Sequence, residues 1–244
     1  MTLYTTIKKY AKFVLGVTAL FFASSSMAIA DENTYHLKVG DFSELQVVDN
    51  INVVLRCNAD SAGLAVFTTT PEVVKAIMFE TNKGKLKIER NFDIPLIPEH
   101  FPTVTVYSNF INSVGNYGDS TLVVERPAPG AQIKVTQQGN GTIRISGLKA
   151  TQTNAKLETG KGLIVIEGAT QNVKLSNVGT GTIDASGLTA QEGTVNILGT
   201  GTVECCISKE LTVRGMGSGK IYLRGTPVIK QRSLGSIKII PTEQ

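Results

Sequence analysis

Asp184 and Glu204 occupy equivalent positions in two neighbouring copies of a short sequence repeat. Paired carboxylates can perform acid/base hydrolysis of a glycosidic bond, or they can bind calcium. Carbohydrate-cleaving enzymes hold the two groups about 5–9 Å apart in a cleft, with aromatic side chains for sugar stacking, and Tyr222 is the lone aromatic residue nearby. We therefore favour solvated acids near Arg144 and Arg224 over a catalytic pair. No catalytic residue is assigned, and Asp184, Glu204 and Tyr222 are kept as candidate ligand-binding residues.

Lys134, Lys156 and Lys174 form a second candidate binding site. Aligning the repeats by eye gives them equivalent outward positions on three successive coils, which predicts a ladder with about 4.8 Å between neighbours. Such a ladder could bind an anionic polysaccharide or lipopolysaccharide. We favour the alternative that the lysines protect an exposed sheet from edge pairing while their aliphatic stems cover apolar surface.

Other chemistry has little support in the sequence. His36 and His100 have no clustered partners, and Cys57, Cys205 and Cys206 could form one disulfide at most, so packing or surface roles are favoured for all five. The recurring Gly-x-Gly pairs lack the third glycine and the helix of a dinucleotide site. The aspartate of a calcium-binding nonapeptide repeat recurs only once. We predict no metal and no cofactor.

A glycine repeat predicts the architecture that would position these residues. Gly-x-Gly turns open five segments, each followed by alternating apolar and polar residues, at 139–147, 160–168, 179–187, 199–206 and 217–225. A degenerate copy at 117–125 precedes them, a truncated one at 235–240 follows, and a second alternating strand precedes each turn. A unit of this size cannot bury its own apolar face, so stacked units in a β-solenoid are expected. Because the spacing breaks a strict multiple of six, we favour a right-handed parallel β-helix over a left-handed hexapeptide helix.

The alternation predicts which side chains fill the solenoid. Two inward rows are expected, and every member is apolar or small: Leu122, Ile143, Ile164, Ile183, Val203 and Ile221 in one, and Val124, Ile145, Ile166, Ala185, Cys205 and Leu223 in the other. The intervening outward positions are mostly polar. This register places Cys205 inside and Cys206 outside.

Three segments follow from the patterning. Residues 1–30 combine three lysines, an apolar stretch at 13–22 and small residues at 28–30, which is typical of a signal peptide and too short for a membrane span, although an uncleaved anchor is the alternative. Residues 31–101 lack the glycine period. Their pattern predicts a β module with strands at 42–57 and 64–69, a helical turn at 70–77 and a hairpin at 77–90. This module would cap residues 102–244, the β-helix, with the boundary in the proline-containing segment 92–102.

Charge excludes one class of partner. Removing residues 1–30 leaves 24 − 3 = 21 basic against 20 acidic residues, a net of +1. Nucleic-acid binding demands clustered Lys and Arg, so we reject a nucleic acid as partner.

The predicted signal indicates an exported protein, in the periplasm, associated with the outer membrane or outside a Gram-negative cell, with no transmembrane span after cleavage.

The order of these features resembles the head GIN domain family of auto-transporter adhesins. The resemblance rests on the signal, the FSELQVVDNINVVL segment at 42–55, the KGKLKIE hairpin at 83–89 and the serial Gly-x-Gly-x-Ile turns, and it covers essentially the whole mature chain. It implies a β-helical envelope protein with no defined biochemical role and supplies no catalytic residues.

Three hypotheses of function remain from the sequence. The leading one is a non-catalytic envelope or surface protein that presents an extended β face to a cell-surface glycan or an envelope protein. The second is a polysaccharide-cleaving β-helix enzyme, which needs a groove that holds Asp184, Glu204 and a basic residue together. The third is a structural subunit that assembles with copies of itself.

Overall fold

The computed structural model describes residues 32–95 and 100–242. The signal peptide predicted at 1–30 lies outside these residues. Strands account for 69% of the structure and helices for 3%, so the all-β prediction is confirmed. Among the described residues, the structure contains no helix with the length and apolar character needed to cross a membrane.

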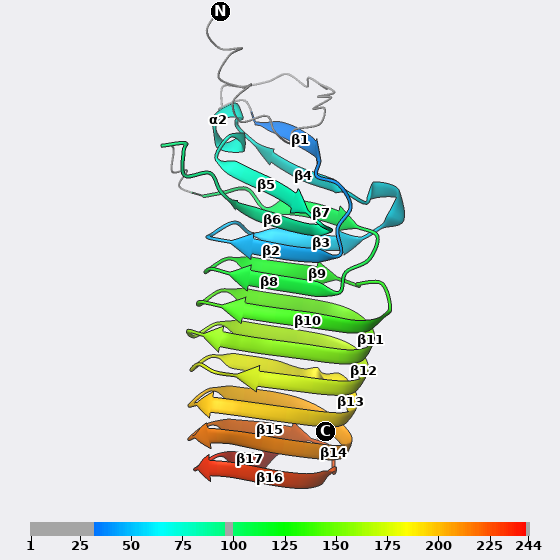
Figure 1. The fold of residues 1–244 in the computed structure, drawn as a ribbon, viewed down its shortest axis with the longest axis vertical. Coiled ribbons are helices and arrows are strands. Elements are labelled where there is room, and N and C mark those ends of the chain that lie inside the picture. Colours follow the sequence, from blue (N-terminus) through cyan, green and yellow to red (C-terminus); the bar gives the residue numbers. More distant parts are fainter. Residues whose placement is uncertain (1–31, 96–99, 243–244) are drawn as a thin grey trace, which may run out of the picture.

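From residue 113 onward the chain winds as a stack of coils whose strands pair in parallel (Figure 1). A β-solenoid of about six turns is thereby confirmed, while its handedness stays a prediction. Its strands are β8 (Ser113–Tyr117), β9 (Thr121–Glu125), β10 (Gly130–Gln138), β11 (Thr142–Thr159), β12 (Leu163–Asn177), β13 (Thr182–Gly199), β14 (Thr202–Gly217), β15 (Lys220–Arg224), β16 (Val228–Gly235) and β17 (Lys238–Pro241).

Both predicted inward rows lie in the core. Leu122, Ile143, Ile164, Ile183, Val203 and Ile221 are each fully buried and lie opposite one another on successive coils. The members of the second row, from Val124 to Leu223, are buried as well. Because each coil covers the apolar residues of its neighbour, the interior forms one continuous core along the stack.

The glycine corners serve two separate purposes. Gly160 has a φ of +86°, a conformation that a side chain disfavours. At Gly181 the reason is close approach, because a Cβ there would lie 2.2 Å from the carbonyl oxygen of Gly162 on the preceding coil. Inside the same corner the buried Asn177 donates from Nδ2 to the carbonyl oxygens of Gly181 (2.9 Å) and Thr202 (3.1 Å). The Gly181 carbonyl oxygen also accepts the backbone N–H of Thr202 at 3.0 Å, so the Asn177 side chain adds a second donor there and links two successive corners.

The first strands of the chain are inserted into the stack out of sequence order. β2 (Glu44–Val48) pairs in parallel with both β6 (Lys85–Arg90) and β8, and β3 (Val53–Cys57) pairs in parallel with both β7 (Val104–Ser108) and β9. The coil formed by β2 and β3 therefore lies between the β6–β7 coil and the β8–β9 coil. The boundary expected at residues 92–102 falls in the connection between β6 and β7, and the division at 101/102 stays a prediction.

Antiparallel strands cover the N-terminal end of the stack. β4 (Leu64–Thr69) pairs with β7 and with β1 (Asn33–Lys38), and β5 (Ile77–Asn82) pairs with β6 as the expected hairpin. The short helix α2 (Pro71–Val74) follows Thr70 at its N-cap position, and a 3-10 turn, η1 (Ala59–Ser61), precedes β4. These antiparallel strands interrupt the parallel ladder that would otherwise continue. Only part of the module expected at 31–101 caps the stack, because β2, β3 and β6 belong to the parallel coils themselves.

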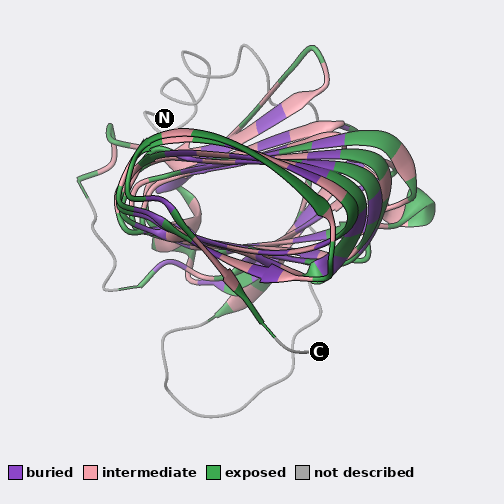
Figure 2. Ribbon diagram, turned by 90° about the horizontal axis from the view of Figure 1, so that it is seen from below, coloured by how far each residue is buried: buried purple, intermediate pink, exposed green. Residues whose placement is uncertain are grey.

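Seen along its axis, the solenoid is a flattened tube with two long sides (Figure 2). We call one side the β9 wall: it contains β7, β3, β9, the first segments of β11–β14 (142–146, 163–167, 182–186 and 202–206), β15 and β17. The other side, the β10 wall, contains β6, β2, β8, β10, the second segments of β11–β14 (150–159, 169–177, 189–199 and 210–217) and β16.

Candidate functional site

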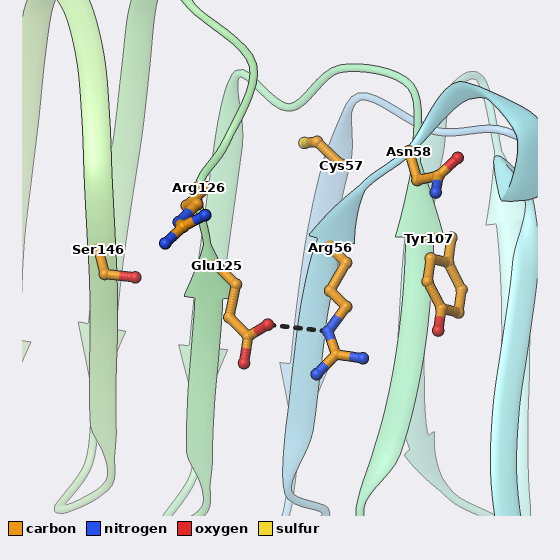
Figure 3. A pocket seen from close by; sticks show the side chains of 7 residues that line it. All are labelled: Arg56, Cys57, Asn58, Tyr107, Glu125, Arg126 and Ser146. Carbon is orange, nitrogen blue, oxygen red and sulfur yellow. Dashed lines mark hydrogen bonds and ion pairs between the residues drawn. The ribbon is translucent and has the colours of Figure 1, made fainter.

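Polar side chains from four coils meet on the outer surface of the β9 wall. Strand pairing places Arg56 of β3 opposite Tyr107 of β7 on one side and opposite Glu125 of β9 on the other, and Glu125 opposite Ser146 of β11. All four alternate with buried residues, so the pleat directs their side chains outward. Figure 3 shows them side by side on adjacent strands.

These residues line an open hollow with a volume of about 510 Å³. Its lining comprises Arg56, Cys57, Asn58, Tyr107, Glu125, Arg126 and Ser146. Arg126 directly follows β9 with a φ of +46°, and its backbone N–H donates to the Ser146 carbonyl oxygen at 2.9 Å. The hollow is therefore assembled from strand ends that the coil register brings together, and we call it the Arg56 hollow.

A charge pair lies at the centre of the Arg56 hollow. Arg56 Nε donates to Glu125 Oε2 at 2.8 Å, and the two side chains are 49% and 44% exposed. The hydrogen bond with Glu125 raises the pKa of the Arg56 guanidinium above its ordinary value, with a smaller contribution from the Tyr107 side chain. Because the pair is exposed to solvent, its stabilising contribution is at most about 1 kcal/mol. The guanidinium can donate hydrogen bonds to a polar ligand, and the carboxylate can accept them.

Cys57 is unsuited to nucleophilic chemistry in this hollow. Burial raises the pKa of its thiol, the charge of Asp41 raises it further, and a backbone hydrogen bond from Ala128 only partly offsets these effects. A reactive cysteine needs a lowered pKa. The lining also includes no histidine to act as a base. The arrangement favours reversible polar binding.

The acidic pair expected from the repeat is present further along the β9 wall. Asp184 lies opposite Glu204, and Glu204 opposite Tyr222, on successive coils. Asp184 Oδ1 accepts hydrogen bonds from the hydroxyl (2.6 Å) and the backbone N–H (3.0 Å) of Ser186. Burial, followed by the charge of Asp184, raises the pKa of Glu204. The side chain of Arg224 donates to the Ser186 carbonyl oxygen.

The expected lysine ladder is wrong in register. Lys134 lies opposite Asn154, and Asn154 opposite Lys174, whereas Lys156 lies opposite Thr136 and Ser176. The error arises because an alternating pattern looks the same after a slip of two residues, and only the pairing distinguishes the two alignments. All three lysines are still exposed on the β10 wall, on the other side of the tube from Asp184, Glu204 and Tyr222. Lys156 Nζ also forms an ion pair with Glu158 Oε1 at 2.8 Å.

The remaining candidates stay separate from these sites. His36 and His100 are exposed, on β1 and in the segment before β7. Cys205 is buried and Cys206 lies on the outer surface, as the register predicted, and all three cysteines are free. Burial raises the pKa of the Cys205 thiol to about 12. Within residues 32–95 and 100–242, no three His, Cys, Asp or Glu side chains are grouped so that they could hold a metal ion.

The Arg56 hollow was not foreseen from the sequence. Glu125 belongs to an expected outward row, but Arg56 and Tyr107 lie in or beside the segment without the glycine period. The alternation of residues 53–57 would have placed Arg56 outward. Its pairing with β9 could not be expected, because the inserted coil does not follow chain order.

Comparison with known proteins identifies a family and a set of similar folds. The family model described as "Putative auto-transporter adhesin, head GIN domain" matches residues 41–227, well over half of the chain. A structure described as a putative adhesin from Bacteroides fragilis is 20% identical with a TM-score of 0.76, and the match covers 86% of this chain and 97% of that one.

Two structures from Parabacteroides distasonis are also similar. One, described as a putative adhesin, is 18% identical with a TM-score of 0.70 over 87% of this chain and 98% of that one. The other, described as a putative lipid binding protein, is 17% identical with a TM-score of 0.69 over 87% and 97%. At these identities the likeness extends to the fold alone. No curated protein matches the chain.

Proposed function

We propose that this chain, which belongs to the head GIN domain family of auto-transporter adhesins, is a non-catalytic protein of the cell envelope or cell surface. It binds carbohydrate or protein ligands through the outer surface of the β9 wall. The predicted export signal at residues 1–30 would deliver it to that location.

The Arg56 hollow is the observation that carries this proposal. Two guanidinium groups, a carboxylate, a phenol and an amide line an open hollow of about 510 Å³, on strands that the solenoid holds in fixed register. Sugars and polar peptide segments present both donors and acceptors, which such a mixed surface can pair. A rigid sheet also loses little conformational entropy when it binds a ligand.

A glycan array with protein that begins at residue 31 tests this proposal. We expect binding to a restricted set of sugars, lost in Arg56→Ala and retained in the double variant Lys134→Ala/Lys174→Ala, which alters the β10 wall instead. Loss in the lysine variant alone would transfer the binding site to that wall. Silence across the array would remove the carbohydrate ligand, and a protein partner would then be sought with the same variants.

Hydrolysis of polysaccharide is the second candidate, and one observation favours it. Glu204 has a raised pKa beside Asp184, a combination that general acids of glycosidases use. The Arg56 hollow, however, includes neither residue. Release of reducing ends by the wild type, abolished in Glu204→Gln, would establish hydrolysis and overturn the non-catalytic assignment.

Assembly with copies of itself is the third candidate. Light scattering coupled to size-exclusion chromatography distinguishes an assembled subunit from a monomeric binder. A concentration-independent monomer would exclude it.

A further inference from the structure

The charged residues of the C-terminal coils are all positive over residues 211–242. Residues 211–242 contain no Asp or Glu and six cations: Arg214, Lys220, Arg224, Lys230, Arg232 and Lys238. One of the six forms a salt bridge within the described residues, between Lys230 Nζ and Glu210 Oε2 at 2.8 Å. The whole mature chain is close to neutral, so this positive charge is concentrated at one end of the solenoid.

An exposed apolar row runs through the same coils. Leu198 lies opposite Met216, and Met216 opposite Leu234, on the outer surface of the β10 wall. Val178 directly precedes them, because its neighbour Asn177 lies opposite Ile197. Exposure rises steadily toward the end of the stack: 39% for Val178, 47% for Leu198, 58% for Met216 and 73% for Leu234. Four stacked coils extend this row over about 14 Å.

Arginines accompany the apolar row. Arg214 lies opposite Arg232, and each is two residues before an apolar member of the row, Met216 or Leu234, so the pleat directs all four to the same surface. Beyond them the stack ends on β16, where Val228 and Ile229 are 66% and 45% exposed. We call the surface formed by Val178, Leu198, Arg214, Met216, Arg232 and Leu234 the C-terminal patch.

We propose that the C-terminal patch docks onto a membrane surface that contains anionic lipids. Arginines bind phosphate groups of lipid headgroups, and apolar side chains beside them enter the boundary between headgroups and acyl chains. Both parts of the patch are used by this one partner. A soluble anionic polysaccharide would satisfy the arginines and leave four apolar side chains in water.

Charge also argues against a second copy as the partner. Contact between two copies through the patch would bring Arg214 and Arg232 of one copy against the same arginines of the other, and like charges across an interface are costly. Docking to lipid has a further geometric consequence. The Arg56 hollow lies on the β9 wall and the patch on the β10 wall, so docking through the patch would turn the hollow away from the membrane. Along the stack, Glu125 is also six coil steps, or about 29 Å, from the coil that contains β17.

Vesicle co-sedimentation tests the proposal with protein that begins at residue 31, which contains every described strand and omits the apolar stretch at 13–22. The vesicles contain phosphatidylglycerol and phosphatidylcholine at one to three, and pure phosphatidylcholine is the comparison. We expect binding to the anionic vesicles only, weakened by salt. Arg214→Gln/Arg232→Gln should lower the partition coefficient about 25-fold, from about fivefold per cation. Met216→Ser/Leu234→Ser should lower it at least about tenfold.

The matched control is Lys134→Gln/Lys174→Gln, which removes the same charge from the same wall but from earlier coils. It should bind within about twofold of the wild type. Equal loss in this control, equal binding to neutral vesicles, or no binding at all would overturn the proposal. A concentration-dependent dimer that Met216→Ser/Leu234→Ser abolishes, without vesicle binding, would assign the patch to self-association instead. Circular dichroism confirms folding of each variant, and glycan binding through Arg56 is scored separately.

Discussion

Replacing Ile164 by alanine should destabilise the protein far more than the same replacement at its neighbour Val165. Ile164 is fully buried between Ile143 and Ile183 on the adjacent coils, and Val165 lies on the outer surface. An Ile→Ala change in a core costs about 2–5 kcal/mol, and the upper half of that range applies where the surroundings cannot collapse. The rigid spacing of about 4.8 Å between coils prevents such collapse, so about 3–5 kcal/mol is expected.

The control, Val165→Ala, keeps the core intact and loses only partial burial and strand propensity, which amounts to about 1 kcal/mol or less. Equilibrium urea unfolding followed by far-ultraviolet circular dichroism measures both variants. A difference of at least about 2 kcal/mol between them is expected. Equal costs for the two positions would refute the assignment of inward and outward residues on which every site depends.

Three further predictions concern single positions. Gly181→Ala should lower the free energy of unfolding in urea by more than about 2 kcal/mol, because the new Cβ would lie 2.2 Å from a backbone carbonyl oxygen. Gly187→Ala should lower it much less, because the nearest atoms belong to the flexible side chain of Glu167. Equal losses in the two variants would contradict this. The free energy of unfolding should fall as pH rises from the ordinary carboxyl pKa through the raised folded-state pKa of Glu204, because the folded state binds the Glu204 proton more tightly than the unfolded state does. Glu204→Gln should remove this dependence. The same pH profile in the variant and the wild type would count against the prediction. Alkylation with iodoacetamide should modify Cys206 in the folded protein and spare Cys205, because burial raises the pKa of the Cys205 thiol to about 12. Mass spectrometry of the peptide that contains both cysteines locates the modification. Modification of Cys205 instead of Cys206 would contradict the register.

The repeated part of the fold could be predicted because two periodic signals agree. Glycine marks the corners, and alternation sorts residues such as Ile143 and Arg144 to the inside and the outside. Both signals are local, so they determine strands, turns and sidedness. They do not determine pairing, because a slip of two residues preserves the alternation, and this is why Lys156 was placed beside the wrong neighbours.

The candidate site was harder to foresee because its parts are far apart in the sequence. Arg56 and Glu125 meet only through the insertion of the β2–β3 coil between coils formed later in the chain. No local pattern encodes that order. The acidic pair Asp184 and Glu204, in contrast, follows directly from the repeat and lies where it was expected.

A single distance tests most directly whether one parallel stack includes the early strands. Residues 105 and 222 lie seven coil steps apart in an outward row on the β9 wall that passes through positions 54, 123, 144, 165, 184 and 204. Pulsed electron paramagnetic resonance on Thr105→Cys/Tyr222→Cys, with spin labels at both sites and the three native cysteines replaced, measures their separation. Seven coil steps predict about 34 Å in a narrow distribution. A separation below about 20 Å, as in a sandwich whose later strands fold back on the earlier ones, would contradict the stack.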